Sequence, residues 1–254
     1  MSTVSMDALK IEITKDRYDA VLFDLDGVLT GTAKVHAVCW KRMFDAFLQA
    51  RAAREGEPFR PFDMGSDYKH YVDGKPRYEG VKSFLESRGI SLPYGDPDDA
   101  PGKDTICGLG NRKNALLNDV IESEGVDVYE GSVAWVHQLH EAGIKTAVVS
   151  SSKNCETILR AAGIEDLFEL RIDGVVAAQL QIAGKPAPDT FLEAARRLGV
   201  EPERTVVVED AISGVQAGRA GGFGLVIGVD REGDAEALRK NGADIVVADL
   251  AELL

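Results

Sequence analysis

The chain has 254 residues, of which 44% are apolar and 28% are charged, a composition typical of a folded globular protein with a sizeable core. Its formal net charge is −13 at pH 7, which argues against a nucleic acid or an anionic membrane as a partner, because neither offers counter-charge to an acidic surface. An anionic substrate would therefore need a local group of Lys, Arg or metal cations.

The first residues and the cysteines bear on the cellular compartment. Residues 1–16 are mixed polar and lack the apolar run of a signal peptide, and no stretch approaches the roughly 20 apolar residues of a membrane span. Cys39, Cys107 and Cys155 are far apart and lack CxxC spacing, which predicts neither a disulfide framework nor a zinc site. We therefore expect a soluble cytoplasmic protein, and a monomer.

In chain order, the predicted elements begin with an apolar strand at Ala20–Asp24. Only helical patterns follow up to about residue 126: Thr32–Ala53, Gly65–Val72, Tyr78–Arg88 and Lys113–Glu124. Beyond that point strands alternate with helices. The strands are Lys145–Ser150, Thr205–Glu209, Gly224–Ile227 and Asp244–Val247, and the helices are Ser132–Ala142, Cys155–Ala162, Pro188–Leu198, Ser213–Ala220 and Asp234–Asn241.

Apolar strands that alternate with helices predict an α/β fold, with a Rossmann-like parallel sheet covered by helices on both faces. The helical run after the first strand predicts an inserted all-helical cap domain. We expect a catalytic core at residues 1–31 and 128–254 and a cap at residues 32–127. The two crossings, near Gly31–Ala33 and Asp127–Tyr129, are candidate hinges.

Two carboxylates, Asp24 and Asp26, follow the first strand and precede Gly27. Mg²⁺ prefers such oxygen ligands, while one carboxylate can attack phosphorus and the other can act as general acid and base. A solvated Asp-x-Asp turn is the alternative. The carboxyl ends of parallel strands meet at one edge of the sheet, so the interpretation depends on what the other strands carry there.

Three further segments carry polar groups suited to the same chemistry. Glu209 and Asp210 end another strand, although Asp210 alone is also typical of a helix cap. Ser150 follows a third strand, where hydroxyls and backbone N–H groups can hold phosphate or simply cap the next helix. Lys185 lies between Gly184 and two prolines, and it is either a surface turn residue or an ammonium held against a phosphoryl group.

Taken together and in order, these four segments resemble the four motifs of the haloacid dehalogenase superfamily of phosphotransferases. The resemblance implies that Asp24 is the nucleophile, Asp26 the general acid and base, and Ser150 and Lys185 the phosphoryl ligands. It also implies an Mg²⁺ cofactor. The metal residues would be Asp24, Asp26 through its carbonyl, and Asp210, with Glu209 beside them.

The cap segment offers candidates for substrate recognition. Thr32, His36 and Trp40 are spaced by four and share a helix face, which is typical either of a site or of core packing. Basic residues stand at two predicted helix starts, at 73–77 and 111–114, where they would either be solvated or bind anions. This layout resembles the β-phosphoglucomutase family. The resemblance implies catalytic roles for Thr32 and His36, and substrate contacts for Trp40, Gly74, Arg77, Lys113, Ser151 and Asn154.

The resemblance implies a Mg²⁺-dependent phosphomutase that acts on a small phosphorylated sugar through an aspartyl-phosphate and a bisphosphate intermediate. A sugar phosphatase, acting on hexose or trehalose phosphates, would use the same core residues. A non-catalytic binding protein on the same fold is the third hypothesis. It is disfavoured because every catalytic position of the family pattern is filled.

Overall fold

The structure is a computed structural model that describes residues 12–231 and 233–254. The expectations that concern residues 1–11, including the lack of a signal peptide and the start of the predicted core domain, lie outside the described residues. Within the described part of the chain, no helix is long and apolar enough to cross a membrane.

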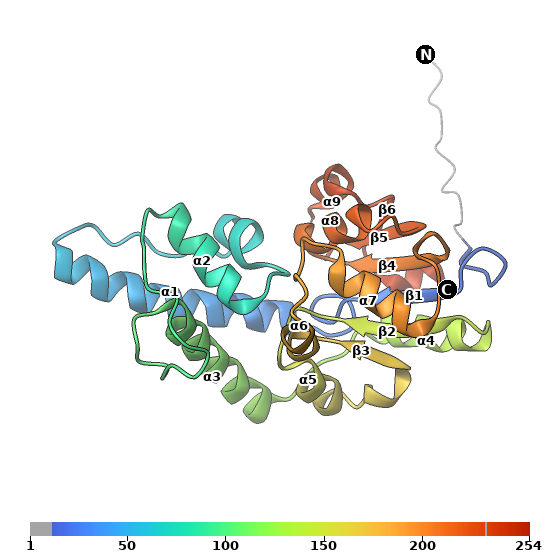
Figure 1. The fold of residues 1–254 in the computed structure, drawn as a ribbon, viewed down its shortest axis with the longest axis horizontal. Helices are drawn as coiled ribbons and strands as arrows, with labels where there is room; N and C mark the ends of the chain where they lie inside the picture. The colour runs from blue at the N-terminus through green and yellow to red at the C-terminus, as the bar shows by residue number, and fades with distance from the viewer. Residues whose placement is uncertain (1–11, 232) are drawn as a thin grey trace, which may run out of the picture.

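Six parallel strands form one sheet in the order β3-β2-β1-β4-β5-β6 (Figure 1). This order confirms the predicted α/β class. The strands are β1 (Ala20–Phe23), β2 (Lys145–Val149), β3 (Leu170–Ile172), β4 (Thr205–Glu209), β5 (Leu225–Val229) and β6 (Ile245–Val247).

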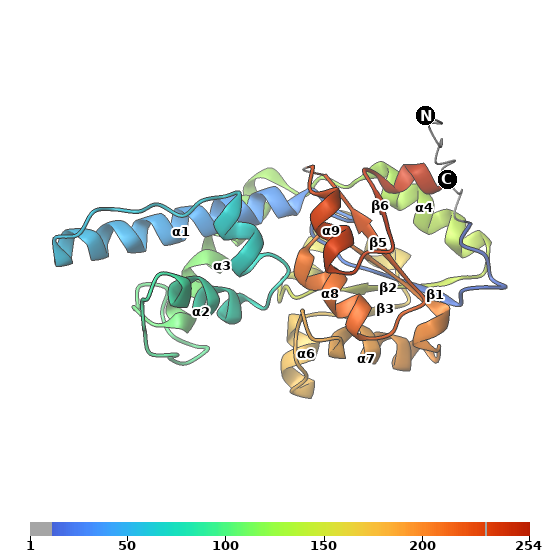
Figure 2. The ribbon, with the colours of Figure 1, turned by 90° about the horizontal axis from the view of Figure 1, so that it is seen from above.

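Helices cover both faces of the sheet, as the apolar strands require. Alternate residues of β1 and β4 pack with α4 (Glu130–Glu141) and α5 (Cys155–Ala161) on one face. The intervening residues pack with α7 (Asp189–Leu198) and α8 (Ile212–Ala220) on the other, and Figure 2 shows α4 and α7 on opposite sides of the sheet. Both faces of the central strands are therefore fully buried.

A separate group of helices follows β1 and lies beside the sheet (Figures 1 and 2). Its elements are α1 (Thr32–Glu55), the π-helix η1 (Tyr68–Val72), α2 (Arg77–Ser87) and α3 (Ile106–Glu124). These helices have an apolar cluster of their own, rich in aromatic side chains, that includes Trp40, Phe44, Phe62 and Phe84. We call this helical group the cap and the remainder the core.

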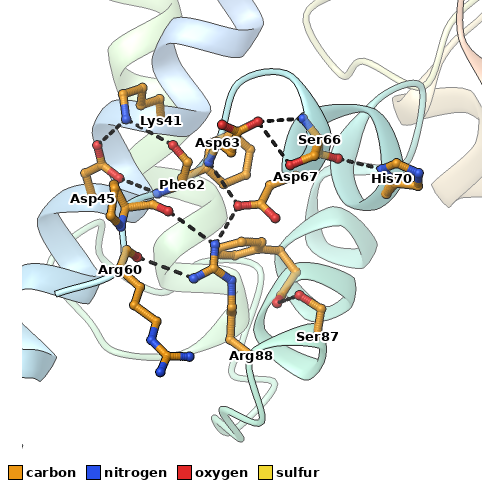
Figure 3. Close-up of polar contacts among 12 residues, drawn as sticks. Lys41, Asp45, Arg60, Phe62, Asp63, Ser66, Asp67, His70, Ser87 and Arg88 are labelled. Atoms are coloured by element: carbon orange, nitrogen blue, oxygen red, sulfur yellow. Dashed lines mark hydrogen bonds and ion pairs between the residues drawn. The ribbon is translucent and has the colours of Figure 1, made fainter. Parts of the chain in front are cut away.

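Polar side chains fasten the long link between α1 and η1 to the cap (Figure 3). Arg88 donates to the carbonyls of Arg60 (3.4 Å) and Pro61 (3.2 Å) and pairs with Asp67 at 2.6 Å. Asp45 accepts the backbone N–H of Phe62 at 2.7 Å. Side chains elsewhere in the cap therefore hold the main chain of the link, and this positions the η1 helix that follows it.

The two chain crossings between core and cap are hydrogen-bonded to one another. The N–H of Gly31 donates to the carbonyl of Asp127 at 2.9 Å, and that of Tyr129 to the carbonyl of Leu29 at 2.9 Å. Both crossings therefore lie side by side at the carboxyl end of β1, which is the arrangement a hinge requires.

Three local predictions differ from the structure. The edge strand β3 and the helix α6 (Gly174–Leu180) were not expected. Helix α3 begins at Ile106, so the expectation that residues 111–114 open a helix is wrong; they lie in its second turn. Thr105 is its N-cap, with a side chain that accepts the N–H of Gly108 at 2.9 Å, and this cap outweighs the low helix propensity of the early glycines.

Candidate active site

Asp24 and Lys185 form the buried centre of the site. Asp24 follows β1, and the Lys185 ammonium donates to its Oδ1 at 2.5 Å and to the carbonyl of Val149 at 2.8 Å. The same ammonium lies 2.6 Å from Oε1 of Glu209, at the end of the neighbouring strand β4. Only 2% of Lys185 is exposed, which excludes the surface-turn alternative.

Burial and the charges nearby together determine the pKa values of Asp24, Glu209 and Lys185. Burial and the neighbouring carboxylates raise the pKa of Asp24 to about 6 and that of Glu209 to about 7, although Lys185 opposes both shifts. Burial alone would lower the pKa of Lys185, but the attraction of Asp24 and Glu209 raises it above its ordinary value. Lys185 is therefore charged at neutral pH, and it favours the ionised form of Asp24.

The residues beside Asp24 fit a divalent cation. Asp24, Glu209 and Asp210 each place one carboxylate oxygen within 4.8 Å of the others. Oxygens bound to one octahedral Mg²⁺ lie about 3–4 Å apart, so small movements would bring these three onto one ion. Burial and the neighbouring carboxylates raise the pKa of Asp210 well above its ordinary value. One lysine does not neutralise this group, which favours a further cation.

Gly27 and Glu209 each make a close contact with the segment around Asp210. A Cβ at Gly27 would lie 1.7 Å from Oδ2 of Asp210, so only glycine allows the Asp210 carboxylate to lie beside the loop that carries Asp26. The expected alternative, Asp210 as a helix cap, is wrong: the N-cap of α8 is Ala211, and the N–H of Ala211 donates to Glu209 at 3.1 Å.

A chain of polar contacts leads from the hinge to Asp26. Thr30 and Thr32 share a hydrogen bond at 2.7 Å, and the Thr32 hydroxyl donates to Oδ1 of Asp26. Nε2 of His36 lies 3.6 Å from the same carboxylate. Burial raises the pKa of Asp26, against the lowering effect of the Thr32 hydrogen bond. A carboxyl group with a raised pKa can both take and return a proton, as a general acid and base must.

Lys113 fixes the tautomer of His36. The Lys113 ammonium lies 3.0 Å from Nδ1 of His36, and an ammonium has only protons to donate. The imidazole proton is therefore on Nε2, which faces Asp26 and has no hydrogen-bond partner among the described residues. Burial, reinforced by Lys113, lowers the pKa of His36 well below its ordinary value, so the ring is neutral at pH 7.

The cap side of the pocket carries cations. Lys113 is buried, its Nζ lies 5.1 Å from the centroid of the Trp40 ring, and burial lowers its pKa to about 8. Arg77, the first residue of α2, donates to Asn111 and to the Tyr78 hydroxyl at 3.2 Å each. Trp40 itself stacks on Phe44 at 5.4 Å, so both interpretations of Trp40 hold: it packs in the cap core and lines the pocket.

A cap loop lies directly on the core beside the pocket. The Ser213 hydroxyl donates to the carbonyl of Asp73 at 2.9 Å, and that of Ser151 to the carbonyl of Gly74 at 2.7 Å. Asn154 of the core donates to Asn114 of the cap at 2.7 Å. A Cβ at Gly74 would lie 2.3 Å from the Ser213 hydroxyl oxygen, which explains the glycine.

Most of the predicted residues meet at one pocket of about 60 Å³ between the cap and the core. Thr32, Lys185 and Glu209 stand behind its wall: Thr32 contacts Asp26, and Lys185 contacts both Asp24 and Glu209. The predicted residues that line the pocket are Asp24, Asp26, His36, Trp40, Gly74, Arg77, Lys113, Ser150, Ser151, Asn154 and Asp210.

Sequence reasoning missed several lining residues. Tyr68, Asp73 and Asn114 come from the cap, and Lys153 from the segment after β2. Three of them had a local signal: Lys153 lies in the segment after Ser150 that was expected to hold phosphate, and Asp73 and Asn114 lie in the two basic segments, 73–77 and 111–114. Tyr68 had none, and it reaches the pocket through the packing of the cap against the core.

Comparison with known proteins agrees with this geometry. Residues 18–222 match the model of the haloacid dehalogenase-like hydrolase family. The chain belongs to this family. A relative named β-phosphoglucomutase, from Mycobacterium tuberculosis, is 52% identical over 94% of this chain and 92% of its own length.

Two further members are informative. The crystal structure of a β-phosphoglucomutase from Clostridium difficile matches this chain with a TM-score of 0.72 and 26% identity, over 93% of each chain. A fructose-1-phosphate phosphatase from Escherichia coli is 30% identical over 83% of this chain and 96% of its own length. The family thus includes relatives named for either activity.

Proposed function

We propose that this haloacid dehalogenase-like enzyme is a Mg²⁺-dependent β-phosphoglucomutase, which interconverts β-D-glucose 1-phosphate and D-glucose 6-phosphate. The observation that carries the proposal is that groups suited to binding phosphate lie on both sides of one pocket. Ser150 lines it on the core side, with the buried Lys185 behind it, and Arg77 and Lys113 line it on the cap side. A hydrolase needs only the first set, whereas a sugar bisphosphate needs both. The high identity to relatives named β-phosphoglucomutase supports the same choice.

In the proposed reaction, Asp24 carries the phosphoryl group as an acyl phosphate. The C6 hydroxyl oxygen of β-glucose 1-phosphate attacks this phosphorus, the bond between phosphorus and the Asp24 oxygen breaks, and Asp26 takes the hydroxyl proton. The glucose 1,6-bisphosphate then reverses its orientation. Asp24 attacks the phosphorus at C1, Asp26 returns the proton to the departing C1 oxygen, and glucose 6-phosphate leaves.

The remaining residues bind and orient the reacting groups. Mg²⁺, held by Asp24, Asp210 and the Asp26 carbonyl with Glu209 beside them, would neutralise the charge on the transferring phosphoryl group. Lys185 and Ser150 would hold its other oxygens. Thr32 and the Nε2–H of His36 point to Asp26 and would hold its carboxylate in place for proton transfer.

The pocket volume implies that the cap moves during the cycle. The pocket has a volume of about 60 Å³, whereas sites for small-molecule ligands have roughly 300–1,000 Å³. The cap must therefore turn away from the core to admit a sugar phosphate. Once it returns, water is excluded, which favours transfer to a sugar hydroxyl over hydrolysis.

A coupled assay for glucose 6-phosphate tests the proposal. β-Glucose 1-phosphate is supplied with Mg²⁺ and a trace of glucose 1,6-bisphosphate, and we expect steady formation of glucose 6-phosphate that Asp24→Ala abolishes. No glucose 6-phosphate, together with steady phosphate release from other sugar phosphates, would instead identify a phosphatase.

The phosphatase is the second candidate, supported by the similarity to the fructose-1-phosphate phosphatase. His36→Ala separates the two, because His36 contacts the proton-transfer carboxylate and not the nucleophile. For a mutase, we expect loss of glucose 6-phosphate formation with an unchanged rate of phosphate release. Unchanged glucose 6-phosphate formation in this variant would count against the mutase.

The location and assembly are also part of the proposal. Cys39, Cys107 and Cys155 are free and buried, which suits the reducing cytoplasm. We propose a cytoplasmic monomer, because the site described here is completed by residues of one chain. Light scattering at micromolar concentration would test the monomer.

A further inference from the structure

Arg231, in the loop after β5, makes contacts that none of the family motifs accounts for. Its Nε donates to the carbonyl of Gly27 at 3.2 Å, and its guanidinium carbon lies 3.6 Å from the centroid of the Tyr129 ring. On its other side, Nη1 donates to the carbonyl of Ala248 at 3.2 Å and to the carboxylate of Asp249. Only 15% of the Arg231 side chain is exposed, although its contact with Ala248 lies at the surface.

The first contact holds the catalytic loop. Gly27 follows Asp26 directly, and its φ of +90° places it in a conformation that other residues rarely adopt. Its N–H donates to the carbonyl of Thr30 at 2.8 Å, its α-carbon lies against the Asp210 carboxylate, and its carbonyl accepts from Arg231. Arg231 therefore fixes the peptide group between Gly27 and Val28, directly after the residue that follows Asp26 and lies against Asp210.

The second contact holds the hinge. Tyr129 lies on the chain as it returns from the cap, and its N–H pairs with Leu29 of the outgoing crossing. Arg231 thus touches both the loop that carries Asp26 and the segment about which the cap would turn. A guanidinium can stack on a ring and donate in its own plane at once, which an ammonium cannot.

We propose that Arg231 is a positioning residue that fixes the catalytic loop relative to the hinge, so that Asp26 and Asp210 meet the substrate and Mg²⁺ in the correct place when the cap closes. This inference rests on the proposed phosphoryl transfer at Asp24. It does not depend on whether the acceptor is a sugar or water.

Arg231→Met tests the inference, because it keeps most of the stem and removes the donors and the charge. The matched control is Arg204→Met: Arg204 also binds several groups, namely Asp19 at 2.6 Å and the carbonyls of Asp16 and Lys15 at 3.0 Å each, but at the opposite end of β4 from Glu209. Mg²⁺ affinity by calorimetry, kcat and KM with the mutase substrate, and hydrolysis of p-nitrophenyl phosphate are measured well below each variant's Tm.

For Arg231→Met we expect the Kd for Mg²⁺ to rise and kcat to fall, each by about 10- to 100-fold, which is the usual effect of removing a group that supports metal ligands. KM should change less than threefold. Arg204→Met should leave all three within about twofold. If both variants behave alike, or if Arg231→Met leaves Kd and kcat within twofold, the inference is wrong.

Tyr129→Leu provides a second variant in case Arg231→Met does not fold. It removes the ring under the guanidinium and should lower both kcat and Mg²⁺ affinity by about 2- to 30-fold, which corresponds to roughly 0.5–2 kcal/mol for such a contact. Unchanged values would overturn the inference. Because Mg²⁺ binding and p-nitrophenyl phosphate hydrolysis do not require mutase activity, failure of the proposed mutase function would leave this test intact.

Discussion

Replacement of Gly74 by alanine should weaken catalysis through one identifiable contact. Gly74 has a φ of +65°, and a Cβ there would lie 2.3 Å from the Ser213 hydroxyl oxygen and 2.9 Å from Cβ of Ala211. Ala211 and Ser213 belong to the start of α8 in the core, whereas Gly74 belongs to the cap. The added methyl group therefore opposes the contact between cap and core in addition to straining its own loop.

The two costs can be separated by a matched variant. Gly89, also in the cap, has a φ of +68°, and an added Cβ would meet no atom within 4 Å. Alanine at either position costs about 1–2 kcal/mol of left-handed strain. Only Gly74→Ala adds overpacking against the core, worth about 1–3 kcal/mol in the closed arrangement. That difference corresponds to a roughly 5- to 150-fold lower kcat/KM for Gly74→Ala than for Gly89→Ala.

The assay compares kcat/KM for the two variants with their Tm values. The clash of Gly74→Ala with the core is relieved when the cap opens, so only the left-handed strain, which both variants share, should lower Tm. We expect both to lose about 2–8 °C for a chain of this size. Equal kcat/KM values for the two would show that the cap loop does not contact α8 during turnover, and the closed arrangement would then be irrelevant to catalysis.

Three further predictions concern charge. Burial lowers the pKa of Lys113 to about 8, so kcat/KM should fall as pH rises through about 8 and this cation loses its proton; Lys113→Met should lack that decline. Because the unfolded chain binds this proton more tightly, the free energy of unfolding should rise between about pH 8 and the ordinary pKa of 10.5, with the opposite sign to the activity. Lys185→Met leaves Asp24 and Glu209 without their cation, so the free energy of unfolding should fall by about 3–5 kcal/mol, measured as a lower Tm. The same variant should lower kcat at least about 100-fold. A Tm within about 2 °C of the wild type would contradict this prediction. Mg²⁺ at about 100 times its Kd should stabilise the protein by about 2.7 kcal/mol and EDTA should reverse the gain, whereas Asp210→Ala should show no gain at all.

The sheet and the core half of the site were predictable because the relevant signals are local. A parallel sheet brings every strand's carboxyl end to one edge, so residues that follow apolar strands must meet there whatever the order of the strands. Asp24, Ser150 and Glu209 needed no further information than this. Lys185 was recognised by its Gly and Pro neighbours, and the structure places it in the buried centre.

The elements that escaped prediction carry weak or contradictory local signals. The strand β3 has only three residues and lies at the edge of the described sheet, beside β2, so it shows no period. Helix α6 begins at Gly174, a poor helix former, and continues with Val175 and Val176, whose branched side chains favour strands. Asp173 decides the outcome, because its carboxylate accepts both valine N–H groups at 2.9 Å and so begins a helix.

The cap half of the site was harder because it depends on contacts between distant segments. Asp73 and Tyr68 line the pocket only because Ser213 and Ser151 hold the cap loop on the core. No spacing in the sequence relates residues 68–74 to residues 151 and 213. Gly74 was the available clue, since a glycine between charged residues signals a turn but does not say what lies against it.

The distribution of charge within the pocket would allow the proposed enzyme to bind a sugar bisphosphate although the whole chain is acidic. The net charge of −13 is a property of the whole chain, but the pocket has two positive poles. One is Lys185, with the cation that the carboxylates would hold; the other is formed by Arg77, Lys113 and Lys153 of the cap and core rim. A bisphosphate satisfies both poles in either orientation, since its two ends carry the same charge. Reorientation therefore exchanges equivalent interactions, and this favours a mutase over a phosphatase, which has no use for the second pole.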